Sequence, residues 1–361
     1  MSSPHFHALR VKEIRKETAD SVSIAFDLPE GLRKDFAFEA GQYITLKKTI
    51  DGEEVRRSYS LCSSPMEPDF RVAIKQVEGG KFSTFANTGL QVGDELEVMT
   101  PMGNFIVQSV SEKGKHYMAF AAGSGITPIL SLLKTTLLGD EHSTFTLVYG
   151  NQQVQSIMFR EEIEALKNKF LGRLHLVHIL SRERLECELN FGRINSEKCA
   201  QLFEQLVDLK EMDEFFLCGP EEMILSVKDF LLNQGVAESK VRFELFNSSS
   251  SSEKKKAYQE SHQADKGKMS TVTIKVDDRS MDIQLAYDGE SILDAALKQG
   301  ADLPFACKGG VCCTCRAKVI EGSVDMEVNY ALEKDEVENG FILTCQAHPT
   351  SDRVVVDFDA R

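Results

Sequence analysis

Four cysteines near the carboxyl end of this chain have a spacing that suits redox chemistry. They read Cys307-x4-Cys312-x2-Cys315, and Cys345 follows after a gap of 29 residues. This is the ligand spacing of a [2Fe–2S] cluster, in which each tetrahedral iron takes two thiolates and two bridging sulfides. The short spacings allow one loop to wrap the cluster, and the distant cysteine closes it.

A zinc site is the alternative for these thiols. Structural zinc prefers paired Cys-x2–4-Cys knuckles, whereas this loop has a single short pair. Gly309 and Gly310 also favour the cluster, because glycine allows backbone N–H groups to approach the sulfides. Cys313 does not fit the ligand spacing, and we interpret it as a small buried residue. The same packing role is expected for Cys62, Cys187 and Cys199.

A second group of residues, in the first third of the chain, has the chemistry to hold a flavin. Arg57 can pair with a pyrophosphate, Tyr59 can pack on the flavin ring, and Ser60 can bond its polar edge. About twenty residues later, glycines open a short helix candidate, and a helix N-terminus attracts phosphate. This cradle suits FAD better than FMN, the alternative. The expected flavin contacts are Arg57, Ser58, Tyr59, Ser60, Lys75, Gly80, Lys81, Phe82, Ser83 and Thr84.

A third group lies in the middle of the chain, where strands meet helices. Gly123-Ser124-Gly125 follows a strand candidate and precedes a helix candidate, although it is not the Gly-x-Gly-x-x-Gly fingerprint. Free N–H groups and the helix dipole at such a place favour a dinucleotide pyrophosphate. The expected contacts are Gly123, Ser124, Gly125, Ile126, Thr127, Ser181, Arg182, Cys218, Gly219, Pro220, Met223 and Phe246.

The pattern of elements around these groups predicts three domains. Short alternating segments in residues 1–112, such as 21–28 and 95–99, predict an antiparallel six-stranded β-barrel. Strands alternate with helices over 113–246, which predicts a parallel α/β sheet. Residues 271–361 form a compact third unit. Between them, 247–270 contains five consecutive serines and is expected to be a flexible linker.

Composition limits the remaining classes of function. The net charge of −14 argues against nucleic-acid binding, which needs a basic face. The sequence shows no apolar run long enough to span a membrane and no signal-peptide pattern near its start, so we expect a cytoplasmic protein without a membrane span. An odd number of cysteines, nine, argues against a disulfide framework.

These motifs, in this order, resemble a known family. Residues 5–246 resemble the ferredoxin–NADP reductase superfamily, and 271–361 resembles a plant-type ferredoxin domain of β-grasp fold. The resemblance implies that Cys307 and Cys312 hold one iron and that Cys315 and Cys345 hold the other. The expected catalytic residues are Ser60, Thr127 and Cys218, and the resemblance implies that the segment starting at Cys218 lies beside the nicotinamide ring.

The resemblance further bears on the choice of nicotinamide. NADPH-using members of the superfamily often place a Ser-Arg pair after the third strand of this domain, against the 2′-phosphate. Ser181-Arg182 occupies that place, so we expect NADPH, with NADH as the alternative. Phe246 ends the reductase part of the chain. It either lies near the flavin, as an aromatic residue often does in this family, or packs on the sheet edge.

The order of the three domains resembles the reductase subunits of ring-1,2-phenylacetyl-CoA epoxidases, which serve phenylacetate catabolism. The function implied is electron transfer from NAD(P)H through FAD and [2Fe–2S] to an oxygenase partner, expected to be di-iron. Related reductases serve other oxygenases, hydroxylases or desaturases. A general ferredoxin or flavodoxin reductase and a non-enzymatic iron–sulfur redox sensor are the other hypotheses. The last unit carries 17 acids and 9 bases, which suits either docking to a basic partner or simple solubility.

Overall fold

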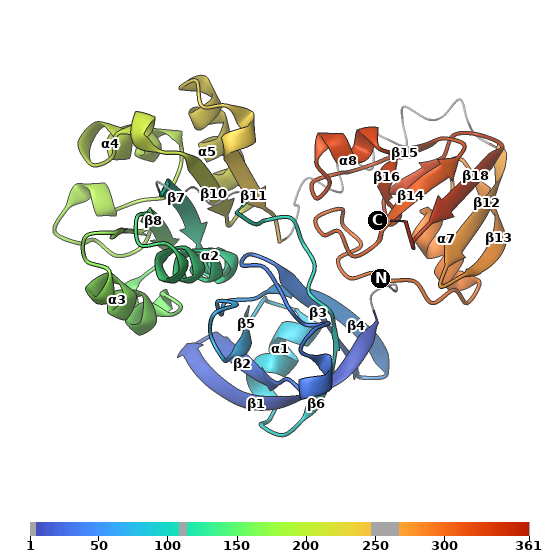
Figure 1. The fold of residues 1–361 in the computed structure, drawn as a ribbon, viewed down its shortest axis with the longest axis horizontal. Coiled ribbons are helices and arrows are strands. Elements are labelled where there is room, and N and C mark those ends of the chain that lie inside the picture. Colours follow the sequence, from blue (N-terminus) through green and yellow to red (C-terminus); the bar gives the residue numbers. More distant parts are fainter. Residues whose placement is uncertain (1–4, 108–113, 247–266, 361) are drawn as a thin grey trace. The chain divides into compact units, whose positions relative to one another are not determined.

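The computed structural model describes residues 5–107, 114–246 and 267–360 (Figure 1). The first domain is a six-stranded antiparallel sheet with the order β4-β3-β6-β1-β2-β5, as the sequence predicts. Its helix α1 (Lys81–Thr88) packs on β2, β3 and β5. The strands are β1 (Phe6–Thr18), β2 (Ser21–Asp27), β3 (Tyr43–Ile50), β4 (Glu53–Ser60), β5 (Phe70–Lys75) and β6 (Glu95–Met99).

The interior of this barrel is filled by inward-facing residues of the strands. Ile24 and Val72 stand opposite each other on β2 and β5, and both are fully buried. Phe82 of α1 belongs to the same buried cluster. Apolar burial of this kind stabilises the domain by roughly 25 cal/mol for each Å² removed from water. The barrel therefore fixes the end of β4 and the start of α1, where the predicted flavin contacts lie.

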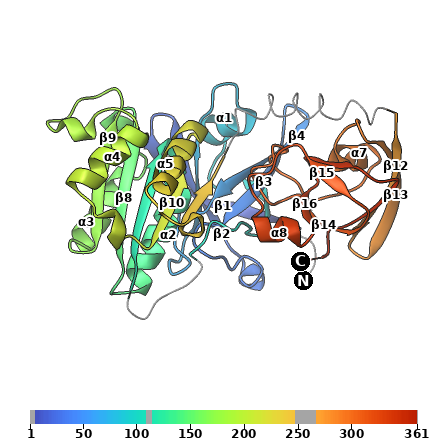
Figure 2. The same ribbon diagram turned by 90° about the horizontal axis from the view of Figure 1, so that it is seen from above.

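The second domain is a parallel sheet with the order β11-β10-β7-β8-β9. Helices α2 and α3 cover one face, and α4 and α5 cover the other (Figures 1 and 2). The order reverses between β7 and β10, and ligands of such sheets bind at this switch point, beyond the carboxyl ends of the strands. The strands are β7 (His116–Ala122), β8 (Thr144–Asn151), β9 (Leu174–Leu180), β10 (Glu214–Cys218) and β11 (Val241–Glu244).

The helices of this domain connect those strands. They are α2 (Ile126–Gly139), α3 (Arg160–Lys169), α4 (Ser196–Gln205) and α5 (Glu221–Asn233), and a 3₁₀ turn, η2 (Gly123–Gly125), precedes α2. Asn195 caps α4, since its side chain accepts a hydrogen bond from the N–H of Lys198. None of the helices in the described ranges is long and apolar enough to cross a membrane.

Helix α2 also joins the first two domains. Ser131 of α2 donates a 2.6 Å hydrogen bond to the carbonyl of Ser63 in the loop after β4. Lys134, 5% exposed, pairs with Glu67 of the same loop at 2.8 Å and with Glu162 of α3 at 2.9 Å. A buried ammonium between two carboxylates fixes the spacing of the elements that carry them.

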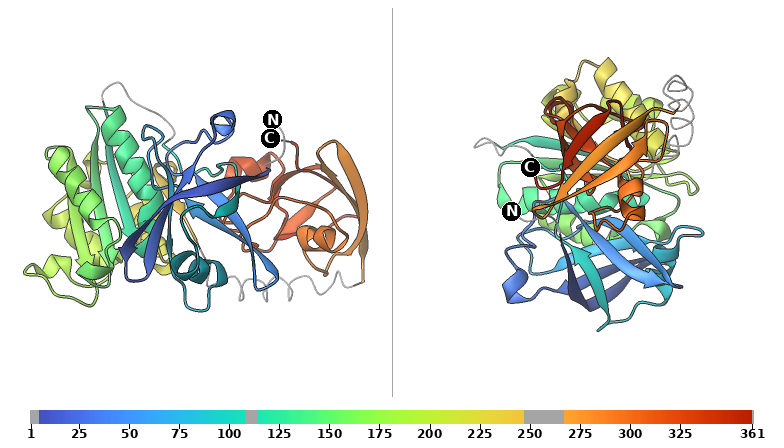
Figure 3. Two further views of the ribbon diagram at one scale, coloured as in Figure 1. Left: turned by 90° about the horizontal axis from the view of Figure 1, so that it is seen from below. Right: turned by 90° about the vertical axis from the view of Figure 1, so that its right-hand side faces the viewer.

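The third domain has a five-stranded sheet with the order β13-β12-β18-β14-β16 and a small β15-β17 pair. Strand β12 lies between its hairpin partner β13 and the parallel strand β18 (Figure 3). Its helices are α7 (Ile292–Lys298) and α8 (Lys334–Glu338). The strands are β12 (Met269–Val276), β13 (Arg279–Ala286), β14 (Arg316–Glu321), β15 (Val324–Met326), β16 (Phe341–Leu343), β17 (Ala347–Pro349) and β18 (Arg353–Asp357).

One predicted boundary needs correction. The sequence predicts that the linker ends at residue 270, but β12 begins at Met269, because Met269 and Ser270 already pair with Ala286 and Leu285 of β13. Ser270 is fully buried. Its burial was not predicted, because the segment that precedes it in the sequence is polar. Residues 247–266 of the expected linker lie outside the described residues.

The Lys134 ion pairs give a test of how the first two domains are joined. Lys134→Met keeps the buried stem but leaves Glu67 and Glu162 facing each other without a cation. We expect a loss of about 2 kcal/mol in the free energy of unfolding, below the ~3–5 kcal/mol of a fully buried pair because both carboxylates are partly exposed. Lys228→Met, which breaks the more exposed pair with Glu238, should cost less than about 1 kcal/mol. Equal losses of unfolding free energy in the two variants, measured by urea denaturation, would contradict this role of Lys134.

Candidate functional site

The four predicted ligand cysteines converge in the third domain. The Sγ atoms of Cys307 and Cys312 are 3.1 Å apart, and Cys345 has side-chain hydrogen bonds with Cys307 and Cys315. Hydrogen bonds from the thiols of Cys312 and Cys345 lower the pKa of Cys307. The loop between α7 and β14 thus brings three thiols to the start of β14, and the turn after β16 supplies the fourth.

The surroundings of these sulfurs fit an iron–sulfur cluster. The N–H of Gly309 donates to Cys307 Sγ at 3.3 Å, so a backbone N–H already points at a ligand sulfur. Gly310 has a φ of 73°, and a Cβ atom there would lie 2.9 Å from the carbonyl oxygen of Val328. Glycine is therefore required at this turn. Three soft donors from one loop, a fourth from the turn after β16, and a backbone N–H turned toward sulfur match the donor set of a [2Fe–2S] centre.

The other cysteines and the nearby histidine fall outside this donor set. Cys313 is buried and its thiol donates to the carbonyl of Ala331 at 3.2 Å, so the packing prediction is confirmed for this residue. It is confirmed for Cys62 and Cys199 as well, whereas Cys187 is exposed, because it lies in the loop after β9 and not in an element. His348 is buried and its Nε2 is 3.1 Å from Glu327 Oε1.

The predicted flavin contacts of the first domain lie at the end of β4 and the start of α1. Arg57 and Ser58 precede Tyr59 on β4, and Arg57 is exposed. The half-buried ring of Tyr59 lies 5.6 Å from the ring of Phe82. Lys81 forms an ion pair with Glu53, and Lys75 lies 3.5 Å from Asp20, so both cations already have carboxylate partners.

The start of α1 has the features of an anion cradle. Gly80 is the N-cap residue, and no side chain of the described residues caps this helix. Ser83 Oγ instead accepts from the N–H of Val77 at 3.1 Å and holds the preceding turn, while Thr84 N–H closes the first helical bond to Gly80. The first N–H groups of α1 therefore have no side-chain cap, as a pyrophosphate site requires.

The predicted dinucleotide contacts meet at the switch point of the second domain. Strand β7 ends beside β10, with Ala121 opposite Cys218, so η2 and the Cys218-Gly219 turn are neighbours. A Cβ atom on Gly125 would lie 2.1 Å from the carbonyl oxygen of Cys218. One on Gly219 would meet Met223 Cε at 2.7 Å. Backbone atoms cannot give way, so only glycine allows the approach at Gly125, whereas the flexible end of Met223 could move aside for a Cβ atom on Gly219.

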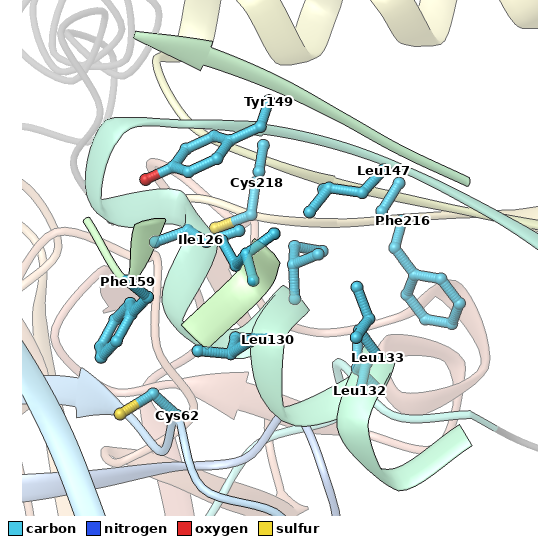
Figure 4. Close-up of a cluster of buried hydrophobic side chains, with 14 of the residues drawn as sticks. Cys62, Ile126, Leu130, Leu132, Leu133, Leu147, Tyr149, Phe159, Phe216 and Cys218 are labelled. Atoms are coloured by element: carbon cyan, nitrogen blue, oxygen red, sulfur yellow. The ribbon is translucent and has the colours of Figure 1, made fainter. Parts of the chain in front are cut away.

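Further hydrogen bonds hold the η2 turn in place. Thr127 Oγ1 donates to the carbonyl of Ser124 at 3.0 Å, and Tyr149 Oη donates to that of Gly123 at 3.0 Å. Figure 4 shows Tyr149 and Cys218 on the same side of the start of α2, near Ile126. Pro220 is the N-cap residue of α5. The turn is thus fixed from several neighbouring elements before any nucleotide binds.

Glu244 is a member of this site that the sequence analysis missed. It ends β11 in register with Cys218, and its Oε2 accepts a 3.0 Å hydrogen bond from Ser60 Oγ of the first domain. Burial raises the pKa of Glu244 to about 8 and raises that of the Cys218 thiol well above its usual value. Ser60, Cys218 and Glu244 therefore bring both domains to one place. The sequence did offer one indication of this role, since Glu244 is an acidic residue among apolar residues at the end of a strand.

The remaining predicted residues lie further along the same sheet edge. Ser181 and Arg182 follow β9, where their N–H groups donate to the carbonyls of Asn151 and Gln152. The Arg182 side chain is exposed. Phe246 is partly buried against a core cluster with residues from both of the first two domains, and this contact agrees with either of its predicted placements. The structure therefore places Ser181 and Arg182 on the same edge as η2 and leaves the guanidinium accessible.

The contact of Gly125 with Cys218 generates one prediction. Gly125→Ala would force the ends of β7 and β10 apart, because the new Cβ atom would clash with backbone atoms of Cys218, which cannot move aside alone. We expect the nicotinamide dinucleotide to bind at least tenfold more weakly, about 1.4 kcal/mol, with unchanged iron content. Gly172→Ala is the matched control, since nothing lies within 4 Å of its Cβ position. Unchanged affinity in equilibrium titrations of Gly125→Ala would contradict the crowded geometry.

The raised pKa of Glu244 leads to a prediction about the pH dependence of stability. Unfolded glutamate ionises near its ordinary pKa of 4.5, whereas the folded carboxyl keeps its proton to about pH 8. Stability should therefore fall as pH rises from about 4.5 to 8, since the unfolded chain then binds fewer protons than the folded one. Glu244→Gln should remove this fall, worth up to about 4 kcal/mol at pH 8. Thermal melts across this range test it, with the exposed Glu222→Gln as control; identical slopes would refute the assignment.

Comparisons with known proteins assign each of the three domains. Residues 8–106 match an oxidoreductase FAD-binding domain, 120–229 match an oxidoreductase NAD-binding domain, and 274–350 match a 2Fe-2S iron-sulfur cluster binding domain. Phthalate dioxygenase reductase, a modular structure for electron transfer from pyridine nucleotides to [2Fe–2S], shares the fold. Its TM-score is 0.59 at 22% identity, and the similarity covers 98% of both chains.

Two curated relatives cover nearly the whole chain. One of the subunits of 1,2-phenylacetyl-CoA epoxidase from Escherichia coli is 46% identical over 99% of this chain and 98% of its own length. The ferredoxin reductase component of 3-ketosteroid-9-alpha-monooxygenase from Rhodococcus rhodochrous is 33% identical over 97% and 96%. The chain therefore belongs to the family of three-domain reductase components of oxygenase systems, which use FAD, a nicotinamide dinucleotide and a [2Fe–2S] cluster.

Proposed function

We propose that this chain is the reductase component of a ring-1,2-phenylacetyl-CoA epoxidase in phenylacetate catabolism. It takes reducing equivalents from NADPH and delivers them singly to a di-iron oxygenase partner in the cytoplasm. The observation that supports this most is the full-length similarity to the component of the Escherichia coli epoxidase. A chain with one two-electron site and one single-electron site has the chemistry that such a partner needs.

When bound, FAD accepts a hydride from the nicotinamide and releases electrons one at a time, and the cluster carries one electron. The protein supplies the positions. We assign Arg57 and the N-terminus of α1 to the flavin pyrophosphate, because an exposed guanidinium and uncapped N–H groups suit it. Cys307, Cys312, Cys315 and Cys345 supply the iron ligands.

Ser60, Cys218 and Glu244 are assigned to the place where the two rings meet. The Ser60 hydroxyl donates to Glu244, whose carboxyl keeps its proton at neutral pH because its pKa is about 8. The buried Cys218 thiol also stays neutral. Uncharged groups line this place, so no fixed negative charge opposes the arrival of a hydride. Thr127 is assigned a positioning role, since its hydroxyl holds the η2 turn.

The third domain is assigned to partner docking. Its 17 acids and 9 bases give it more than half of the net charge of the chain, and such a surface attracts a basic partner at low ionic strength. We propose domain boundaries of 1–112 for the flavin domain, 113–246 for the nicotinamide domain and 269–361 for the cluster domain, with the linker in between.

The choice of NADPH rests on Arg182. Its exposed guanidinium can pair with the two additional charges of a 2′-phosphate, which NADH lacks. Arg182→Gln should lower kcat/KM for NADPH at least tenfold, about 1.4 kcal/mol, and change that for NADH less than about twofold. Arg184→Gln, whose wild-type side chain pairs with Glu188, is the control. Equal losses with both nucleotides, measured by stopped-flow flavin reduction, would remove Arg182 from this role.

Reconstitution tests the proposed partner. The purified chain is mixed with NADPH and either the oxygenase components of phenylacetyl-CoA epoxidase or the oxygenase of 3-ketosteroid-9-alpha-monooxygenase. We expect ring-epoxidised phenylacetyl-CoA, formed at least about tenfold faster than the hydroxylated steroid, because each reductase is fitted to one partner surface. Coupling to the steroid oxygenase at an equal or higher rate would overturn the proposal, while leaving the reductase chemistry intact.

A further inference from the structure

One buried side chain beside the thiol loop has no role in the function described so far. Gln346 directly follows Cys345, and its side chain is fully buried. Its Nε2 atom is 2.8 Å from the carbonyl oxygen of Cys345, 3.1 Å from that of Lys308, and 3.6 Å from Cys345 Sγ. All three neighbours are acceptors, so the NH2 end of the amide faces them, and its two hydrogens serve three acceptors, with one shared between the carbonyl oxygen and Sγ of Cys345. The orientation of this side chain is therefore determined.

The carbonyl that Gln346 holds belongs to an unusual residue. Lys308 is exposed but has a φ of 51°, in the left-handed region that residues with a Cβ atom adopt at a cost. Lys308 lies between Cys307 and Gly309. The N–H of Gly309 donates to Cys307 Sγ. The hydrogen bond from Gln346 thus holds the turn that presents a ligand and an N–H donor. It links this turn to the cysteine that comes last in the chain.

The backbone around Gln346 is held as well. Its carbonyl accepts a 2.9 Å hydrogen bond from the N–H of Glu327, and its Cγ packs against the position where a Cβ atom of Gly310 would lie, at 3.2 Å. The side chain is thus held through Nε2, while its Oε1 atom is buried without a hydrogen-bond partner among the described residues. An N–H fixed near a ligand sulfur withdraws electron density from it and favours the reduced, more negative state of a cluster.

We propose that Gln346 is a positioning residue that raises the reduction potential of the cluster, through an N–H that the carbonyl oxygen and Sγ of Cys345 share and through its hold on the Lys308 turn. The proposal deepens the electron-transfer function and rests on the cluster, but it does not depend on which oxygenase is the partner. Its test is therefore a potential, which is measured without any partner.

The experiment compares variants of the full chain by anaerobic redox titration monitored by electron paramagnetic resonance. Gln346→Met keeps the volume and removes the donor. We expect a more negative midpoint potential, equivalent to roughly a tenfold change in the reduction equilibrium, the size of one hydrogen bond to a charged group. Gln284→Met is the matched control. It removes the amide of an exposed glutamine of β13 that bonds Thr271, and it should leave the potential unchanged. A wild-type potential in Gln346→Met would overturn the proposal.

A second variant covers the case in which Gln346→Met loses iron. Glycine adopts a positive φ without strain, so Lys308→Gly in the same chain should restore the turn and the iron content. The double variant is compared with Lys308→Gly alone, because this change also removes the ion pair with Asp294. A more negative potential in the double variant supports the proposal. Equal potentials, or iron content that glycine does not restore, would refute it.

Discussion

The convergence of four thiols is the constraint on which the rest of this molecule depends. A thiolate is stable in a folded domain only when metal or hydrogen bonds offset its burial. Here the loop from Cys307 to Cys315 supplies N–H donors, and Cys345 is brought to it by the β16 turn. The five-stranded sheet of the third domain holds these two segments together. Without it, the chain would have no single-electron site.

The proposed two-electron site is built on a different physical principle. Backbone atoms of Gly125 and Cys218 come so close that no side chain fits between them, which brings the ends of β7 and β10 into one crevice. Buried neutral groups, and not a charged acid–base pair, occupy the place where Ser60 of the barrel meets this crevice. The arrangement positions cofactors and leaves the chemistry to them, as expected for electron-transfer enzymes.

Residues with strong local patterns were predictable from the sequence. Strands such as His116–Ala122 and Glu214–Cys218 have the expected bounds, since they are apolar runs that end at turns or helix caps. Glu244 was missed because its partner, Ser60, lies 184 residues away and local patterns contain no such information. The exposure of Cys187 was missed for a related reason. A cysteine in a loop is buried only if another element covers it, and within the described ranges no element covers this one.

The central claim is that one polypeptide holds a flavin and an iron–sulfur centre that exchange electrons. Anaerobic titration of the purified chain with NADPH, without any partner, tests it most directly. Because flavin takes two electrons and the cluster one, full bleaching of both absorption bands should need about 1.5 equivalents of NADPH and yield the paramagnetic reduced cluster. Bleaching of the flavin alone, complete at about one equivalent with no paramagnetic cluster, would contradict the account.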